Sequence, residues 1–206
     1  MAAAAPARRS RLPTAERREQ IVTAAMACFA ERGFEGTTTR MLARAAGVSE
    51  GLIFRHFPTK RSLYRAIIAR RISEPPAGLM PAEAAERGDD RAVLSSIAST
   101  LVARVSKDPS FMRLLFYSAL EGAPLSRMFY QARVRRVRSF LASYLERRMK
   151  EGALRVVDPA AAAGAFMGMV ANYIQQKHLF RVPVARLAPD ELVRTWVDLF
   201  LKGLQR

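Results

Sequence analysis

Side chains that could contact both base edges and phosphates gather between Thr38 and Ser62. Threonine and serine hydroxyls, arginine and histidine are groups that proteins use against the bases and backbone of a nucleic acid. Apolar residues lie between these polar side chains, and Gly47 and Pro58 interrupt the segment. The pattern predicts a short helix, a tight turn and a second short helix with one face open, which suits the major groove of duplex DNA.

Two capped helices are expected to position these side chains. Thr38 and Ser49 each have the short oxygen-bearing side chain of an N-cap, and Gly47 stops the first helix. Ile53 and Phe57, four residues apart, place the apolar side of the second helix inward. Its outward face is then formed by Glu50, Gly51, Leu52, Arg55 and His56, with Phe54 at the margin.

The helices on either side complete a small bundle. Thr59 can cap a third helix after Pro58, and this helix continues towards Ile72. Lys60 and Arg61 in its first turn would favour a phosphate. A preceding helix runs from a cap at Thr14 to Gly33, which supplies a left-handed end. Its apolar face is predicted to pack on the later helices, and it consists of Ile21, Val22, Ala25, Met26 and Phe29, facing Leu42, Ile53, Phe57 and Leu63.

Many residues of this segment match one family of regulators at fixed spacing. They are Ile21, Ala24, Ala25, Phe29, Gly33, Phe34, Thr37, Thr38, Thr39, Arg40, Leu42, Ala43, Ala45, Ala46, Gly47, Val48, Ser49, Gly51, Phe57, Lys60 and Leu63. With them, residues 14–71 resemble the DNA-binding domain of the tetracycline-repressor (TetR-type, AcrR-like) transcriptional regulators. The rest of the chain resembles that family in helical character and length.

The resemblance implies an all-α protein, with an N-terminal three-helix bundle and a larger helical ligand and dimerisation domain. We expect a basic arm over residues 1–13, the helix-turn-helix domain over 14–72 and the second domain over 73–206. The implied function is that of a homodimeric repressor, which binds a pseudo-palindromic double-stranded DNA operator and is released by a ligand, without a cofactor. The expected DNA-binding residues are Thr38, Thr39, Arg40, Ser49, Glu50, Gly51, Leu52, Phe54, Arg55, His56 and Lys60.

Two departures from the family pattern bear on recognition. Phe54 stands where the family usually has tyrosine, which removes a hydroxyl contact to phosphate. Glu50 stands where lysine or glutamine is common; it repels phosphate and could accept from a cytosine amino group. Leu52 is suited to a thymine methyl group. By resemblance, Lys60 binds a phosphate.

The charge distribution also favours a polyanionic partner. The net charge is +16, and residues 1–71 hold 14 Lys and Arg against 5 Asp and Glu. An architectural DNA-binding protein of low specificity would share this property, and so would a membrane-surface protein. The arginines at positions 8, 9 and 11 could reach a minor groove or belong to a solvated tail. The N-terminus lacks the apolar core of a signal peptide and no span would cross a bilayer, so we expect a cytoplasmic protein without membrane contact.

Catalysis and metal binding lack a sequence signal. There is no glycine-rich phosphate loop, no nucleophile elbow and no carboxylate pair placed for acid–base work. Two histidines without clustered acidic or thiol partners do not predict a metal site. The single cysteine, Cys28, lies among apolar residues and is interpreted as a core residue rather than a redox sensor.

The second domain is expected to be helical after a loop over residues 75–88. Helices are predicted to begin at Asp89 or Asp90 and at Pro109, and Gly122 closes the latter. A long helix follows from about Leu125 to Lys150. Its arginines are interpreted mostly as a solvated face, with an anion site as the alternative: Arg133, Arg135, Arg136, Arg138, Arg147 and Arg148.

Two final helices, over 159–180 and 190–204, are more apolar than one packed face requires. The family resemblance implies that they form a four-helix dimer interface; the alternative is a larger core within one chain. The expected interface residues are Phe166, Met167, Val170, Ile174, Leu192, Trp196 and Phe200.

An effector pocket is also implied by the resemblance, among the helices after residue 89. Its apolar lining would favour a small hydrophobic or aromatic molecule. Simple core packing is the alternative for each lining residue. The expected lining is Leu101, Leu115, Phe116, Tyr144, Phe166 and Tyr173.

Overall fold

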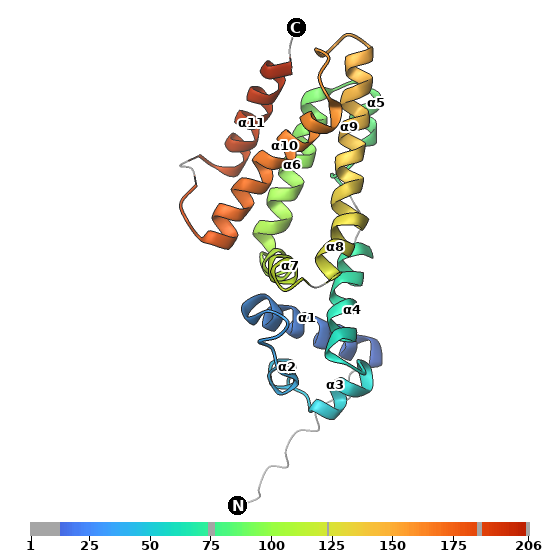
Figure 1. Ribbon diagram of the computed structural model, residues 1–206, viewed down its shortest axis with the longest axis vertical. Helices are drawn as coiled ribbons and strands as arrows, with labels where there is room; N and C mark the ends of the chain where they lie inside the picture. The colour runs from blue at the N-terminus through green and yellow to red at the C-terminus, as the bar shows by residue number, and fades with distance from the viewer. Residues whose placement is uncertain (1–12, 74–76, 123, 185–186, 205–206) are drawn as a thin grey trace, which may run out of the picture. The chain divides into compact units, whose positions relative to one another are not determined.

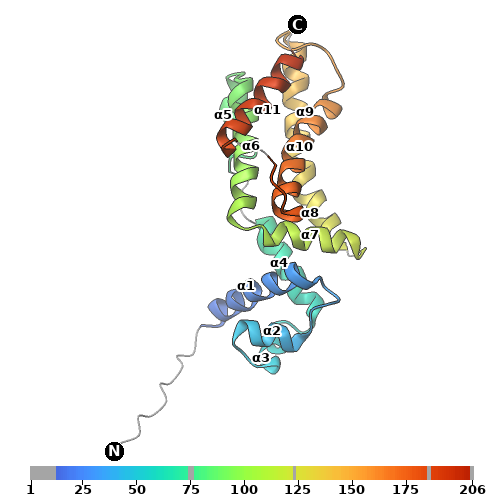
Figure 2. The ribbon, with the colours of Figure 1, turned by 90° about the vertical axis from the view of Figure 1, so that its left-hand side faces the viewer.

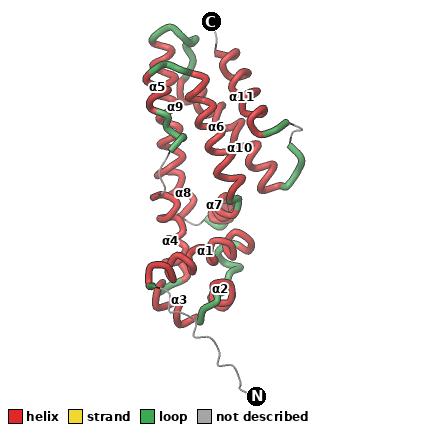
Figure 3. The backbone as a smooth tube through the Cα atoms, turned by 180° about the vertical axis from the view of Figure 1, so that it is seen from behind, coloured by secondary structure: helices red, strands yellow, loops and turns green. Residues whose placement is uncertain are grey.

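The computed structural model describes residues 13–73, 77–122, 124–184 and 187–204. Every regular element in these ranges is a helix, as the tube in Figure 3 shows, so the expected all-α class is confirmed. The chain forms two compact units that divide between Ile67 and Ile68.

The first unit contains three complete helices and the beginning of a fourth, drawn in blue to cyan in Figure 1. Their bounds are α1 Thr14–Arg32, α2 Thr39–Ala46, α3 Glu50–His56 and α4 Lys60–Ser73. The cap expected at Thr14 is wrong, because Pro13 occupies the N-cap and makes no side-chain cap bond. Gly33 has φ 71° as expected of a glycine end, but its ψ of 179° is extended rather than left-handed helical.

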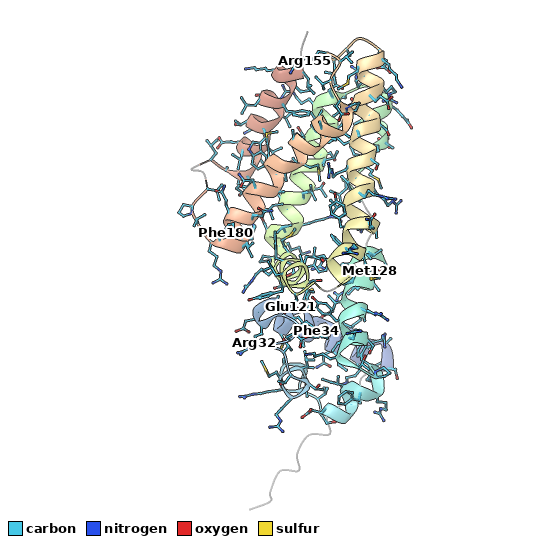
Figure 4. All side chains as sticks on the ribbon, in the orientation of Figure 1. Arg32, Phe34, Glu121, Met128, Arg155 and Phe180 are labelled. Atoms are coloured by element: carbon cyan, nitrogen blue, oxygen red, sulfur yellow. The ribbon has the colours of Figure 1, made fainter. Side chains whose placement is uncertain are left out.

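Residues four apart on α1 build the core of this unit. Ile21, Ala25 and Phe29 are buried, together with the facing residues Leu42, Ile53, Phe57 and Leu63 that the pattern predicted. Tyr64 adds a buried ring that meets Phe29 edge-on at 4.9 Å and Phe34 at 5.1 Å. The ring of Phe34, which is labelled in Figure 4, lies 5.8 Å from the Phe29 ring, centroid to centroid, and covers the end of α1.

The second unit contains the last turns of α4 and the remaining helices. Their bounds are α5 Ala82–Glu86, α6 Asp90–Lys107, α7 Ser110–Leu120, α8 Pro124–Phe129, η1 Tyr130–Val134, α9 Arg135–Lys150, α10 Pro159–Ile174, η2 Gln175–Phe180 and α11 Pro189–Leu204. Asp89 caps α6 by accepting from the Ala92 amide at 2.9 Å. The linker or poorly periodic loop expected over 75–88 contains a short helix instead, because α5 lies within it and Leu79, Ala84 and Ala85 are buried in the core.

The core of the second unit lies between lengthwise helices. α10 packs on α9 and α6, and α11 packs on α6. In Figures 1 and 2 these four helices run lengthwise, whereas α7 is seen end-on in one view and lengthwise across the other. The buried side chains between them include Leu94, Ile97, Leu141, Phe166 and Val170.

The long helix expected near residues 125–150 contains a turn that periodicity did not predict. Helical structure is continuous from Pro124 to Lys150, but η1, from Tyr130 to Val134, is a π-helical turn. Such a turn holds one more residue than an α-helical turn and changes which side chains face inward. Arg133, within this turn, lies buried four residues before the inward-facing Val137.

The division between the units falls five residues before the expected boundary at residue 72. The reason is that the last turns of α4 bond within the second unit. Arg71 forms an ion pair with Asp108, and Arg133 donates to the Arg71 carbonyl at 3.3 Å. A helix can therefore belong to one unit at its start and to the other at its end.

Candidate DNA-binding surface and internal cavity

The turn between α2 and α3 has the geometry that its sequence predicts. Thr38 Oγ1 accepts from the Met41 amide at 3.3 Å, and Ser49 Oγ accepts from the Leu52 amide at 3.2 Å. Gly47 adopts a left-handed conformation, with φ 63° and ψ 35°, where a side chain would be strained. Thr59 caps α4 in the same way, since it accepts from the Ser62 amide at 3.0 Å.

The predicted DNA-contacting side chains lie on this helix pair. Arg40, Ser49, Glu50, Gly51 and Arg55 are exposed, and Thr39, Leu52 and His56 are half-buried. Phe54 was expected at the margin but is 45% exposed, which gives α3 an open aromatic ring. The arginines at positions 8, 9 and 11 lie outside the described residues.

Glu50 has a cationic neighbour that the sequence reasoning did not assign. Its Oε1 lies 3.6 Å from Nε of Arg40, so α2 and α3 are joined by an ion pair across the turn. Both side chains are largely exposed, and such pairs contribute little to stability. The pairing offsets the repulsion that Glu50 alone would exert on a phosphate.

Polar side chains of α1 hold the ends of α2 and α3. Gln20 Nε2 donates to the Ala46 carbonyl at 2.9 Å, and Arg18 Nη1 donates to the His56 carbonyl at 2.8 Å. The Arg18 guanidinium also lies 4.1 Å from the Phe57 ring centroid. Carbonyls at a helix end lack helical partners, so these donors satisfy them and orient both helices. Sequence reasoning missed Arg18 and Gln20, because long-range contacts leave no local signal.

Lys60 differs from the expected phosphate contact. Its Nζ donates to the Phe34 and Thr37 carbonyls at 2.8 and 3.1 Å and lies 4.2 Å from the Phe34 ring centroid. Thr37 is fully buried, and its hydroxyl donates to the Gly33 carbonyl at 2.7 Å. Lys60 therefore joins α4 to the segment between α1 and α2, while the neighbouring Arg61 is exposed.

A cavity of about 160 Å³ lies within the second unit. It opens between the last turns of α4, α6, α7 and the η1 region. The lining is largely apolar and includes four charged side chains. It consists of Arg71, Leu79, Leu101, Arg104, Val105, Asp108, Phe111, Met112, Leu115, Phe129, Arg133, Val134, Val137 and Met167.

Only part of the predicted pocket coincides with this cavity. Leu101 and Leu115 line it, whereas Phe116, Tyr144, Phe166 and Tyr173 do not. Tyr144 donates to Asp90 at 2.5 Å, and both the Tyr173 and Phe166 rings pack against α11. These large residues belong to the core because α9 and α10 turn them towards neighbouring helices.

Two arginines of the long helix are not solvated. Arg133 is only 9% exposed and lines the cavity, which overturns its assignment to a solvated face. Arg148 is paired with Asp90 at 2.9 Å and also contacts Glu151. Burial and the hydrogen bond to Asp90 raise the pKa of Tyr144 far above its usual range, so its phenol stays protonated.

The expected dimer residues divide into two groups. Phe166, Val170, Ile174 and Leu192, expected at a dimer interface, are buried within the chain, and Met167 lines the cavity. Trp196 and Phe200 are half-buried. A shallow groove nearby is lined by exposed residues of both final helices, among them Ala161, Ala165, Leu199 and Gly203.

The described residues offer neither a cluster of metal ligands nor a membrane-spanning helix. These residues contain no group of three or more His, Cys, Asp or Glu side chains that could hold a metal ion. None of the described helices has the length and hydrophobicity needed to cross a membrane. Cys28 is half-buried rather than a full core residue, and burial, with a smaller effect of Glu31, raises the pKa of its thiol.

Two family models match the chain, one in each part. Residues 21–67 match the bacterial regulatory proteins of the TetR family, and residues 92–203 match the C-terminal domain of AefR-like transcriptional repressors. The second match alone covers more than half of the chain. Both matches include elements described above, the α2–α3 pair in the first and most of the cavity lining in the second.

Individual relatives agree with this assignment. The chain is 31% identical over 106 residues to the nucleoid occlusion factor SlmA of Actinobacillus pleuropneumoniae, which covers 51% of this chain and 52% of that protein, about half its length. It is 47% identical over 51 residues to the repressor AcnR of Corynebacterium diphtheriae, covering 25% and 27% of the two chains.

A solved structure shares the fold over nearly the whole chain. AibR in complex with isovaleryl coenzyme A and operator DNA has a TM-score of 0.61 and 23% identity, covering 90% of this chain and 98% of that one. With two family models matched in order along the chain, this protein belongs to the TetR family of bacterial transcriptional regulators.

Proposed function

We propose that this protein is a homodimeric repressor that binds a pseudo-palindromic DNA operator and is released by a small effector. One observation carries the DNA part: α2 and α3 are each capped at their N-terminus by a side-chain oxygen, and α1 donates to their last carbonyls. An exposed helix fixed in this way can enter a major groove with its side chains already placed. The proposed activity is binding without catalysis, in the cytoplasm, where the operator lies.

Recognition is assigned to the exposed surface of α2 and α3. Leu52 and Phe54 offer apolar contact to thymine methyl groups, while Arg55 and His56 can reach base edges or phosphates. Arg40 and Glu50 form a pair at one edge, where Arg40 can turn to a phosphate and leave Glu50 for a cytosine amino group. Lys60 serves the surface by fixing α4 rather than by contacting DNA.

Release is assigned to the cavity of the second unit. Its lining includes Arg71, on the helix that begins in the DNA-binding unit and ends beside the cavity. A ligand that binds one arrangement of this helix better than another would change the DNA affinity. The size of the change is set by the difference between the ligand's binding free energies for the two arrangements. Support for two kinds of ligand on this fold comes from AibR, which was solved in complex with isovaleryl coenzyme A and operator DNA.

Selection of bound sequences from random duplexes tests the operator part. A repressor of this kind should enrich a palindromic motif whose half-sites lie about one helical turn, roughly 34 Å, apart or a multiple of it. An enriched pool without symmetry or without any motif would reject it.

A second candidate is an architectural DNA-binding protein of low specificity. The net charge of +16 and the likeness to a nucleoid occlusion factor favour it. Binding to random DNA would then be as tight as binding to the selected motif, at every salt concentration. For the repressor we expect the motif to bind at least about 1,000-fold more tightly.

Dimerisation is assigned to the exposed sides of α10 and α11. The double variant Ala165→Glu/Leu199→Glu places charge on this face without touching the buried residues, so it should yield folded monomers. Operator affinity should fall by roughly 100-fold or more, because the two half-site contacts are no longer linked. Sedimentation and a DNA titration of one preparation measure both effects.

The variant Ser139→Glu/Ser143→Glu, on the exposed side of α9, adds the same charge and should stay dimeric. Val170→Glu should instead unfold the second unit, because Val170 has no exposed surface. A folded Ala165→Glu/Leu199→Glu dimer with unchanged operator affinity would refute the assigned interface.

A further inference from the structure

The cavity of the second unit carries an excess of positive charge. Among its described lining residues, Arg71, Arg104 and Arg133 contribute three guanidinium groups and Asp108 contributes one carboxylate. Arg133 is the deepest of them, with 9% of its surface exposed. A buried guanidinium loses hydration and gains most from an anionic acceptor, because the surrounding apolar wall lowers the local dielectric.

Two of these arginines meet at the end of α4. Arg71 pairs with one oxygen of Asp108, whose other oxygen accepts from the Ser110 amide at 3.1 Å. The Arg71 guanidinium lies 5.0 Å from the Phe111 ring centroid, and Arg133 donates to the Arg71 carbonyl at 3.3 Å. Three cavity residues, Asp108, Phe111 and Arg133, thus contact the last turn of α4, and Asp108 is the anionic one among these three.

We propose that the effector is a small monocarboxylic acid with a compact apolar body, whose carboxylate binds Arg133 and Arg71 in competition with Asp108. This proposal rests on the proposed function and names its ligand class. Planar guanidinium groups hold carboxylates through paired N–H donors, which makes the class more specific than an apolar lining alone would indicate.

The size of the cavity limits the apolar body. A cavity of about 150 Å³ accommodates benzene, and this one measures about 160 Å³. Leu101, Val105, Met112 and Leu115 supply aliphatic contacts, and Phe129 offers a ring. The body therefore has about the size of an aromatic ring or a short acyl chain.

Competition with Asp108 links the acid to the DNA. When the ligand carboxylate takes Arg71, the ion pair between α4 and the segment before α7 opens. At the end of α4, the Arg71–Asp108 ion pair is then replaced by an ion pair between Arg71 and the ligand, whose occupancy depends on ligand concentration. Operator affinity follows the acid because α4 begins in the DNA-binding unit.

Calorimetric titration of the full-length dimer with benzoate, phenylacetate and hexanoate tests the class. Benzamide and benzylamine are the neutral and cationic controls of similar shape. We expect at least one acid to bind about tenfold or more tightly than benzamide, and benzylamine not to bind. Equal binding of acid and amide, or no saturable binding of any acid at millimolar concentration, overturns the proposal.

Variants assign the preference to these residues. Arg133→Met should abolish the preference for acid over amide, whereas Arg136→Met, an exposed arginine of the same helical run, should retain it. Asp108→Asn should tighten acid binding several-fold, because a competing and repelling carboxylate is removed. If Arg133→Met fails to fold, Arg133→Lys should still weaken acid binding several-fold. An unchanged preference in Arg133→Met, or unchanged or weaker acid binding in Asp108→Asn, overturns the proposal.

Operator binding on the same preparations separates the two proposals. If the protein binds a palindrome but none of the acids, the proposed ligand class is refuted and the repressor function stands. If it binds acids through Arg133 but prefers no DNA sequence, the repressor function is refuted and the proposed acid site stands.

Discussion

The two units of this protein use their cationic side chains differently. In the first unit, Arg18 donates to a carbonyl at the end of α3, Lys60 donates to carbonyls between α1 and α2, and both cations lie over aromatic rings. In the second unit, Arg71 and Arg133 surround a cavity in which Asp108 is the one described lining carboxylate. Backbone carbonyls cannot leave when a ligand arrives, whereas a carboxylate on a side chain can be replaced.

This difference indicates a division of labour. Cations bound to the backbone make the α2–α3 surface rigid, so that its side chains meet DNA in a set arrangement. Arg71, which is bound to a replaceable carboxylate, makes the end of α4 responsive to an anion. We therefore expect the cations of the first unit to stabilise its fold. We expect the polar contacts of the second unit to be independent of them.

The largest effect is expected for Lys60. Lys60→Met removes two charge-assisted hydrogen bonds and a ring contact, so the free energy of unfolding should fall by about 2 kcal/mol. The dependence of DNA affinity on salt should not change, because no phosphate contact is lost. Arg61→Met, at an exposed neighbour, should leave stability within about 0.5 kcal/mol and reduce the slope of log affinity against log salt by about 1.

Denaturant titrations and DNA binding at several salt concentrations measure this pair. If Lys60→Met keeps its stability and reduces the slope, Lys60 contacts phosphate after all, and the contrast between the units is lost.

A smaller effect is expected where Tyr144 meets Asp90. Tyr144→Phe removes a hydrogen bond to a charged acceptor, so it should destabilise the second unit by about 1.5 kcal/mol at neutral pH. The raised pKa of Tyr144 adds a pH dependence, since the folded state retains a proton that the unfolded state releases near pH 10.0. The contribution is present below that pH and is lost as the pH rises through the folded-state pKa.

Urea titrations of both proteins from neutral to alkaline pH measure this contribution. The wild-type free energy of unfolding should fall more steeply above about pH 10 than that of Tyr144→Phe. Parallel curves would show that the phenol does not stabilise the folded state.

Thr37 should matter less and only in the first unit. Thr37→Val keeps the shape of the side chain but leaves the Gly33 carbonyl without its donor at a fully buried position. We expect a loss of about 1 kcal/mol in the free energy of unfolding, with unchanged acid binding in the second unit. Thr39→Val, on the partly exposed neighbouring helix, should be nearly neutral. A change in acid binding caused by Thr37→Val would contradict the separation of the two units.

Local sequence signals were sufficient for the helix-turn-helix caps but not for contacts between distant residues. Caps at Thr38, Ser49 and Thr59 and the glycine turn at Gly47 are confirmed, because each depends on residues within one helical turn. Gln20 and Arg18 were missed because their carbonyl partners lie 26 and 38 residues away. Family resemblance supplied the fold of the remainder.

In the second unit, periodicity identified apolar residues but not what they face. Phe166 and Val170 were assigned to a dimer face, yet α6, α9 and α11 bury them within the chain. Arg133 was placed on a solvated face because runs of arginine are usually exposed, yet it is buried. Of the six residues predicted to line a pocket, Leu101 and Leu115 line the cavity, because local periodicity does not show which helices an apolar side chain faces.

The smallest effect concerns a chemical rate at Cys28. Burial raises the pKa of this thiol, and Glu31 raises it further while Arg32 opposes the shift. The reactive thiolate is therefore scarcer at neutral pH in the folded protein than in the unfolded chain. Iodoacetamide should alkylate Cys28 more slowly in the native protein than in urea, and Glu31→Gln should raise the native rate slightly, since a charge that disfavours the thiolate is removed. Equal alkylation rates of Cys28 in the native protein and in urea would mean that α1 unfolds readily. This result would contradict the rigid α2–α3 surface, because α1 holds the ends of both helices.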